Sequence, residues 1–382
     1  MIKITDKVNC CGCNACVQCC PKQCITMYQD EEGFDYPVVN SDECIACGLC
    51  EKVCPVLNSG ESKKPLKIYA AKNRNEEIRL KSSSGGVFTV LAEDVIRRRG
   101  VVFGVAFDKD WNVYHTYTEN MDGLAAFRGS KYVQSKVGSS YKQVRSFLKD
   151  GRDVLFTGTS CQIAGLKRFL IKDYPNLLTV EILCHGVPSP KVWQRYLAEK
   201  KAQYECKDIC QVSFRDKRKG WAQFHLVIDF KNKTQYIASF DEDAYLKGFL
   251  SNLCLRPSCY SCKCKNGRSN SDLIIADYWN INEALPDYND NKGVSLVLVN
   301  SSKGLSIMNG LSAQIDYEET GYEVCKGMNG GFLEHVSIPK KRQIFFRLLN
   351  KNKTTLSYMV EKCLKINLSN RIINKVRRIF KL

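Results

Sequence analysis

Cysteines with a repeated spacing are the residues of this chain best suited to chemistry, and they dominate its first 54 positions. Eight of them form two C-x2-C-x2-C-x3-C-P runs, with each residue of the second run 34 positions after its counterpart: Cys10, Cys13, Cys16 and Cys20, then Cys44, Cys47, Cys50 and Cys54. Three thiolates at i, i+3 and i+6 can hold three corners of one iron–sulfur cube, and the Cys before proline then points to the other cube. The spacing therefore predicts two 4Fe-4S clusters, one on Cys10, Cys13, Cys16 and Cys54, the other on Cys44, Cys47, Cys50 and Cys20.

The same spacing is the signature of bacterial two-cluster ferredoxins, so residues 1–60 are predicted to form such a module. A structural zinc site or a disulfide module is the alternative. Zinc usually uses two separated CxxC pairs, however, and neither alternative needs a repeated Cys-Pro ending. Cys11, Cys19 and Cys24 fall off the ligand spacing, and we expect them to pack around the clusters as small apolar residues.

The elements that must position further reactive residues begin near residue 68, after a polar, turn-rich linker at 58–65. Hydrophobic patterning predicts strands at 68–71, 101–107, 113–117, 153–157, 177–183, 212–215, 225–230, 235–240, 273–278 and 295–299. It predicts helices at 86–98, 141–148, 162–169 and 190–200. This alternation favours an α/β domain with a mixed sheet.

Loops between these elements carry the second group of candidate residues. Residues 82–86, SSSGG, open a helix, and hydroxyls, glycine backbone and a helix N-terminus together suit a phosphate or a flavin edge. Serine is also an ordinary N-cap, which is the alternative. Residues 156–162 and 183–188 each place a cysteine at the carboxyl end of a strand, where open α/β sheets bind ligands.

Five motifs in order resemble one family: SSSGG, TGTSCQIAGLK (157–167), CHGVPSP (184–190), LRPSCYSCK (255–263) and ADYW (276–279). Over residues 66–330 the chain resembles the coenzyme F-420 (F420) hydrogenase/dehydrogenase beta-subunit family, often joined to a ferredoxin module. The resemblance implies an FAD-binding α/β domain that exchanges electrons between flavin and clusters. The expected FAD-binding residues are Ser83, Ser84, Gly85, Gly86, Thr157, Gly158, Thr159 and Asp277.

A third 4Fe-4S cluster is the further implication of this resemblance. Its expected ligands come from three loops: Cys161, Cys184, Cys259 and Cys262. A zinc clip or free thiols are the alternatives. Two departures from the family pattern are Thr159-Ser160-Cys161, where Thr-Pro-Cys is usual, and Cys264, which replaces a common aromatic residue and could compete as a ligand.

Two polar groups near these motifs have open roles. His185 lies inside a motif and is the candidate catalytic residue, able to protonate a substrate or flavin position, although a loop histidine bonded to backbone is as common. Arg215, Lys217, Arg218 and Lys219 form a basic loop that we expect to be solvated, with binding of an anionic substrate or cofactor phosphate as the alternative.

Charge is unevenly distributed along the 382 residues, whose net charge is +17. Residues 1–57 carry −4 and residues 339–382 carry +12. At 369–382 the pattern predicts a basic amphipathic helix that lies on anionic lipid or on a partner, or packs back on the body. No nucleic-acid-binding module accompanies the charge, so nucleic acid is not an expected partner. The first residues lack an apolar secretory segment and no window is long enough to span a bilayer, so we expect a cytoplasmic protein with peripheral contact to the inner face of the membrane.

The expected fold is α+β: a two-cluster ferredoxin module (1–60), an α/β flavin-binding domain with a mixed sheet (66–330) and a basic C-terminal tail (338–382). The expected function is an oxidoreductase that passes electrons between a reduced carrier, either ferredoxin or the deazaflavin F420, and an organic substrate through 4Fe-4S clusters and FAD. The alternative is a non-catalytic electron-transfer subunit that connects a partner enzyme to the carrier.

Overall fold

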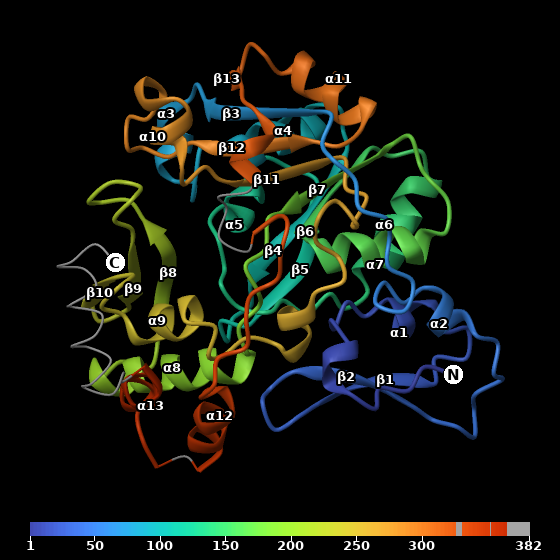
Figure 1. Ribbon diagram of the computed structural model, residues 1–382, viewed down its shortest axis with the longest axis vertical. Helices are drawn as coiled ribbons and strands as arrows, with labels where there is room; N and C mark the ends of the chain where they lie inside the picture. Colours follow the sequence, from blue (N-terminus) through green and yellow to red (C-terminus); the bar gives the residue numbers. More distant parts are fainter. Residues whose placement is uncertain (326–330, 352, 365–382) are drawn as a thin grey trace, which may run out of the picture.

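The computed structural model describes residues 1–325, 331–351 and 353–364. Its strands form an eight-stranded mixed sheet, a three-stranded antiparallel sheet and a two-stranded hairpin (Figure 1). The predicted mixed α/β architecture is therefore confirmed.

The eight-stranded sheet forms the centre of the molecule. Its strands, in spatial order, are β13 (Ile315–Glu319), β3 (Lys67–Asn73), β12 (Ser295–Val299), β11 (Leu273–Asp277), β7 (Leu177–Ile182), β6 (Val154–Thr159), β4 (Val101–Phe107) and β5 (Val113–Thr118). The four strands β4, β6, β7 and β11 are parallel, while β12, β13 and β5 pair antiparallel to their neighbours. The central strands are buried almost throughout, as expected for parallel strands covered on both faces.

Helices cover both faces of this sheet. On one face, α4 (Val87–Arg97), α5 (Leu124–Phe127) and α11 (Ser302–Gly310) pack against alternate strand residues such as Leu155. On the other face, α6 (Ser140–Lys149) and α7 (Ser160–Leu170) pack against Phe156, the next residue along β6. Successive strand residues point to opposite faces, which explains why neighbours in sequence enter different cores.

The ferredoxin module packs directly on this α/β body. It contains the short helices η1 (Lys7–Asn9), α1 (Ala15–Cys19) and α2 (Leu49–Lys52) and the hairpin β1 (Ile25–Gln29) and β2 (Asp35–Val39). Helix α1 contacts α6 and α7, and Cys13, Ala15 and Val53 share a core with those helices. Phe34 at the hairpin is fully buried in a second core of the body. The module is thus part of the packed molecule.

The three-stranded sheet and four helices form this second core, in which Phe34 is buried (Figure 1). The elements are α8 (Pro190–Gln203), β8 (Ile209–Asp216), β9 (His225–Phe230), β10 (Gln235–Ser239), α9 (Ala244–Leu250), α12 (Arg342–Lys351) and α13 (Leu356–Leu364). Phe345, Phe346 and Met359 of the last two helices are buried there. Residues 342–364, expected in a tail, therefore belong to the body, and the helix predicted at 369–382 lies outside the described residues.

Short elements complete the chain: α3 (Glu76–Leu80), η2 (Pro257–Ser261), α10 (Ile281–Ala284), η3 (Pro286–Tyr288) and η4 (Tyr322–Cys325). None of the helices in the described residues has the length and apolar character needed to cross a membrane.

Candidate functional site

The topology brings the predicted site residues to one edge of the large sheet. Strands β3, β6, β7 and β11 point in the same direction, so their carboxyl ends share an edge. Cys161 follows β6, Cys184 follows β7 and Asp277 ends β11. Gly85 lies beside them, because its amide donates to Ser295 Oγ at the start of β12, directly opposite Asp277. Open α/β sheets bind ligands at this edge.

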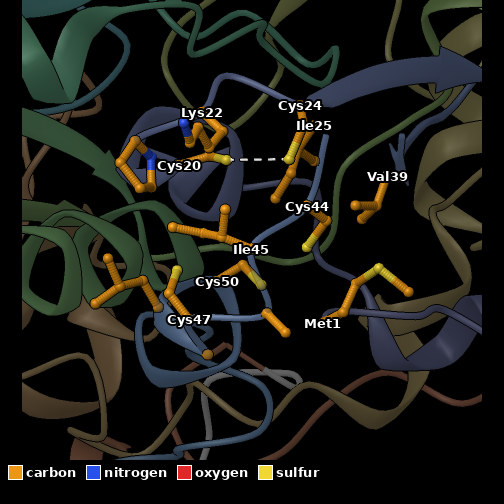
Figure 2. A pocket seen from close by; sticks show the side chains of 14 residues that line it. Met1, Cys20, Lys22, Cys24, Ile25, Val39, Cys44, Ile45, Cys47 and Cys50 are labelled. Atoms are coloured by element: carbon orange, nitrogen blue, oxygen red, sulfur yellow. Dashed lines mark hydrogen bonds between the residues drawn. The ribbon is translucent and has the colours of Figure 1, made fainter. Parts of the chain in front are cut away.

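Four cysteines of the ferredoxin module surround a first cavity, which is open to solvent (Figure 2). Three come from the second run and one from the first: Cys44, Cys47, Cys50 and Cys20. This is the set predicted for one cluster. Cys24 lines the same cavity, with its Sγ 3.5 Å from Cys20 Sγ. Cys47 is exposed to solvent, so this cluster site lies at the surface of the molecule.

The other set of four ferredoxin cysteines lies deeper. Burial, followed by the nearby Cys10 and Cys54 thiolates, raises the pKa of the Cys16 thiol above its usual range. Cys54 therefore lies with residues of the first run, as the crossed ligand pattern requires. Cys13 packs on the body, because a Cβ added at Gly165 of α7 would be 3.0 Å from Cys13 Sγ.

A second cavity, also open to solvent, lies where the ferredoxin module meets the sheet edge. It is lined by the four cysteines expected to bind a third cluster, Cys161, Cys184, Cys259 and Cys262, and by two more, Cys11 and Cys264. Burial raises the pKa of Cys259 to about 12 and that of Cys184 well above its usual value. A hydrogen bond from Cys264 instead lowers the pKa of Cys262 to about 6.

The thiols of both cavities suit iron–sulfur clusters as a donor set, since four cysteines from separate turns surround each space. Buried thiols with raised pKa values stay protonated unless a metal replaces the proton. Within the described residues, no three His, Cys, Asp or Glu side chains converge closely enough to hold a metal ion as they stand.

Cys11 is the residue whose position the sequence did not indicate. Interaction with the Cys13 thiol, followed by burial, raises the pKa of the Cys11 thiol, whereas the Cys161 thiol lowers it, so the Cys11 side chain lies next to both. It therefore connects a predicted ligand of the ferredoxin module with a predicted ligand of the third cluster. The expected packing role is consistent with this position, but its spacing in sequence gave no sign that it lines the second cavity.

His185 lies in the same cavity as the four thiols. One ring nitrogen, Nε2, is 2.6 Å from Asn252 Oδ1, and the ring meets Phe249 edge-on at 5.3 Å between centroids. Burial lowers the pKa of His185 below its usual value. The partner is thus a side chain and not backbone, and the catalytic role stays a prediction.

The SSSGG loop is tightly bonded within the body. Ser84 Oγ donates to the carbonyl of Val294 at 2.7 Å, and Ser83 Oγ accepts from the amide of Ser130 at 2.7 Å. A Cβ at Gly85 would lie 2.3 Å from the Ala71 carbonyl oxygen of β3. Close approach of strand backbone therefore explains this glycine. Gly86 has φ +82° and precedes α4 without a side chain to cap that helix.

The Thr157–Thr159 segment is also bonded internally. Thr157 Oγ1 donates to the Phe103 carbonyl at 2.9 Å. Thr159 and Gln162 form a capping box at the start of α7, and Thr159 Oγ1 lies 3.3 Å from Cys161 Sγ. These residues thus position Cys161, and their contact with FAD stays a prediction.

The expectation of a solvated basic loop is wrong for two of its residues. Arg215 is buried and makes two hydrogen bonds with the Asp277 carboxylate, at 2.9 and 3.1 Å. Trp221 Nε1 donates to the same carboxylate at 2.8 Å. Lys217 Nζ donates to the carbonyls of Arg79, Ser84 and Lys292. Long-range partners, which a local charge pattern does not reveal, hold both cations inside, and the Asp277 carboxylate is occupied by Arg215 and Trp221.

Comparison with known proteins places these motifs in a family. A model described as coenzyme F420 hydrogenase/dehydrogenase, beta subunit N-term matches residues 68–142, and its C-terminus counterpart matches residues 151–323. A 4Fe-4S dicluster domain model matches residues 9–58. The chain therefore belongs to this family of iron–sulfur oxidoreductases and carries an N-terminal 4Fe-4S dicluster domain, which confirms the resemblance inferred from the motifs.

Individual relatives match only parts of the chain. Coenzyme F420-dependent sulfite reductase of Methanocaldococcus jannaschii is 26% identical over 196 residues, covering 49% of this chain and 29% of its own length. Ferredoxin-1 of Caulobacter vibrioides is 43% identical over 53 residues, covering 14% of this chain and 42% of its own. This chain thus spans less than half the length of these relatives. A structure of the F420-reducing NiFe hydrogenase complex from Methanosarcina barkeri aligns with 79% of this chain and 91% of that chain, at 15% identity and a TM-score of 0.49.

Proposed function

We propose that this chain is a flavin-dependent iron–sulfur oxidoreductase that passes electrons between a reduced carrier and an organic substrate through three 4Fe-4S clusters and FAD. The observation that carries the proposal is the position of Cys11, which lines the second cavity together with Cys161 and whose thiol lies next to that of Cys13. It puts a predicted ligand of the ferredoxin module one thiol away from the second cavity. The surface position of Cys47 makes the first cavity the point where a carrier protein reaches the chain.

The neighbourhood of α4 supports a phosphate-bearing cofactor beside this path. Arg128 Nε is 3.2 Å from Thr89 Oγ1 in the first turn of α4, so a cation lies at the positive end of an uncapped helix. Burial also lowers the pKa of Lys131, close by in the loop that bonds Ser83, to about 7. An anion at this position would compensate both cations and the helix dipole. The pyrophosphate of FAD supplies such an anion, and the flavin supplies hydride or paired-electron transfer.

Substitutions at the two ends of α4 test whether FAD binds at the N-terminus of this helix. Arg128→Met removes the cation at the N-terminus, whereas Arg97→Met removes one at the C-terminus that pairs with Glu93 on the surface. Losing a charge-assisted hydrogen bond of about 1.5–3 kcal/mol should weaken FAD binding roughly tenfold to a hundredfold in the first variant. The control should bind like the wild type. Equal affinity in all three proteins, or no FAD binding by the wild type, contradicts the flavin proposal.

The rate at which reduced ferredoxin reduces FAD tests the proposed electron path through the clusters. The full chain is reconstituted anaerobically with iron, sulfide and FAD and mixed with reduced ferredoxin, and the bleaching of flavin absorbance is followed. Cys262→Ser should slow this bleaching strongly, while dithionite should still bleach the flavin of both proteins. Equal rates with ferredoxin in both proteins would refute a path through the second cavity.

The competing proposal is a non-catalytic electron-transfer subunit. It is supported by the match to the sulfite reductase, which covers only 29% of that longer relative. It predicts that the purified chain reduces no organic acceptor with ferredoxin or F420 supplied, until a partner enzyme is added. Turnover by the chain alone, measured as substrate-dependent oxidation of either carrier, decides between the two.

A further inference from the structure

Arg256 lies between the ferredoxin module and the second cavity, and its side chain is 1% exposed. Its backbone belongs to the body: its amide donates to the Val187 carbonyl, and its carbonyl accepts from the amide of Cys259 at 2.9 Å. Arg256 is thus fixed in the loop that carries a predicted ligand of the third cluster.

The guanidinium of Arg256 extends into the ferredoxin module. Nε donates to the Cys10 carbonyl at 2.7 Å, and Nη2 donates to the Asp35 carbonyl at 2.9 Å and lies 3.5 Å from Cys10 Sγ. Its carbon centre is 4.4 Å from the ring centroid of Tyr36. Gly12 makes room for it, since a Cβ there would be 2.8 Å from Nη1.

The charge of this guanidinium has no carboxylate partner within the part of the chain that the structure describes. The remaining acceptor, Gln134 Oε1 at 3.0 Å, is also neutral. A buried cation without a counter-charge destabilises the folded chain. Arg215 differs in this respect, because the Asp277 carboxylate compensates its charge. Thiolate ligands make an iron–sulfur cluster anionic, so a cluster on Cys10 would supply the missing negative charge.

We propose that Arg256 sets the reduction potential of the first ferredoxin cluster, the one on Cys10, Cys13, Cys16 and Cys54. Reduction adds one electron to that cluster and breaks no bond. A cation and a hydrogen bond at Cys10 Sγ stabilise the more negative reduced state and so raise the potential. Arg256 thereby makes the cluster nearest the body easier to reduce than it would otherwise be. This inference rests on the ferredoxin part of the proposed function and is independent of FAD and of the third cluster.

The test is a redox titration of the anaerobically prepared full chain, followed by electron paramagnetic resonance. The signal of the first cluster is identified as the one that Cys13→Ala changes. Arg256→Gln should shift its midpoint potential to more negative values. Arg256→Lys, which keeps the charge but loses the planar fork that reaches Cys10, should shift it in the same direction by a smaller but measurable amount.

Arg342→Gln is the matched control. Arg342 is also a buried arginine at the junction, bonded to Glu32 of the hairpin and to the Leu255 carbonyl, but none of its hydrogen bonds goes to a cysteine. It should leave the potential unchanged. An unchanged potential in Arg256→Gln with full iron content, or an equal shift in Arg342→Gln, overturns the proposal. If Arg256→Gln does not retain the cluster, a wild-type potential in Arg256→Lys overturns it. A wild-type chain that holds no third cluster would contradict the proposed function but not the effect of Arg256 on the first cluster.

Discussion

Gly85→Ala should destabilise the α/β body because the added methyl group meets strand backbone. The Cβ would lie 2.3 Å from the Ala71 carbonyl oxygen, 2.7 Å from the Ser295 amide nitrogen and 2.9 Å from Ser295 Oγ. Relief requires the loop to move away from β3 and β12. That movement breaks two hydrogen bonds, from Gly85 N to Ser295 Oγ at 3.0 Å and from Asn73 N to Gly85 O at 2.7 Å.

The size of the effect follows from these contacts. Two lost hydrogen bonds cost about 0.5–1.5 kcal/mol each, and overpacking adds about 1–3 kcal/mol, so we expect the free energy of unfolding to fall by roughly 2–6 kcal/mol. With an unfolding entropy of about 2.1 cal/mol/K per residue, 1 kcal/mol shifts the Tm of a chain of 382 residues by only about 1.2 °C, which gives a decrease of roughly 2–7 °C. Thermal unfolding followed by circular dichroism measures it.

Gly310→Ala is the control for this substitution. A Cβ at Gly310, at the end of α11, meets nothing within 4 Å. Its effect should stay within about 1 kcal/mol. Equal Tm values for the two variants would refute the steric explanation of Gly85. If the steric explanation holds, a Gly85 variant that no longer binds flavin shows only that its loop has moved. Substitution of Arg128 is then the more specific test of FAD binding.

Two further predictions concern basic residues. Lys217→Met leaves three carbonyl oxygens without their donor, so it should lower the free energy of unfolding, measured by denaturant titration, by roughly 2–4 kcal/mol. Arg218→Met, the control at an exposed side chain, should change it by less than about 1 kcal/mol. The basic segment 369–382 should bind anionic vesicles at low salt and release them at high salt, because charge screening weakens the attraction. In a flotation assay, a chain that ends at Leu368 should no longer float with the vesicles, and equal flotation of both chains would contradict the prediction.

Much of the architecture was predictable because the informative patterns are local. The repeated cysteine spacing predicts the crossed ligand sets, and strand signals such as 101–107 agree with β4 residue for residue. The edge strand β13 was missed because it is short and largely polar, and only its pairing with β3 makes it a strand. Helix α12 was also missed, because its basic residues favoured a solvated tail and gave no sign that Phe345 and Phe346 are buried.

The parts of the site that the sequence did not show depend on contacts between distant residues. Arg215 is buried by an acid 62 positions away, and Cys11 meets a thiol 150 positions away. No periodicity or spacing encodes such pairs. Arg256 could be found only once the ferredoxin module was seen to pack on the body, since its partner Cys10 lies 246 positions earlier in the chain.

The iron content of anaerobically prepared protein tests the central claim, that a third cluster connects the ferredoxin module to the body. The wild type should contain about 12 iron atoms per chain, and Cys259→Ser combined with Cys262→Ser should leave about 8. Cys206→Ser combined with Cys210→Ser, at cysteines outside both cavities, should leave about 12. A wild-type content of about 8, or an unchanged content in the Cys259 and Cys262 double variant, would contradict the account.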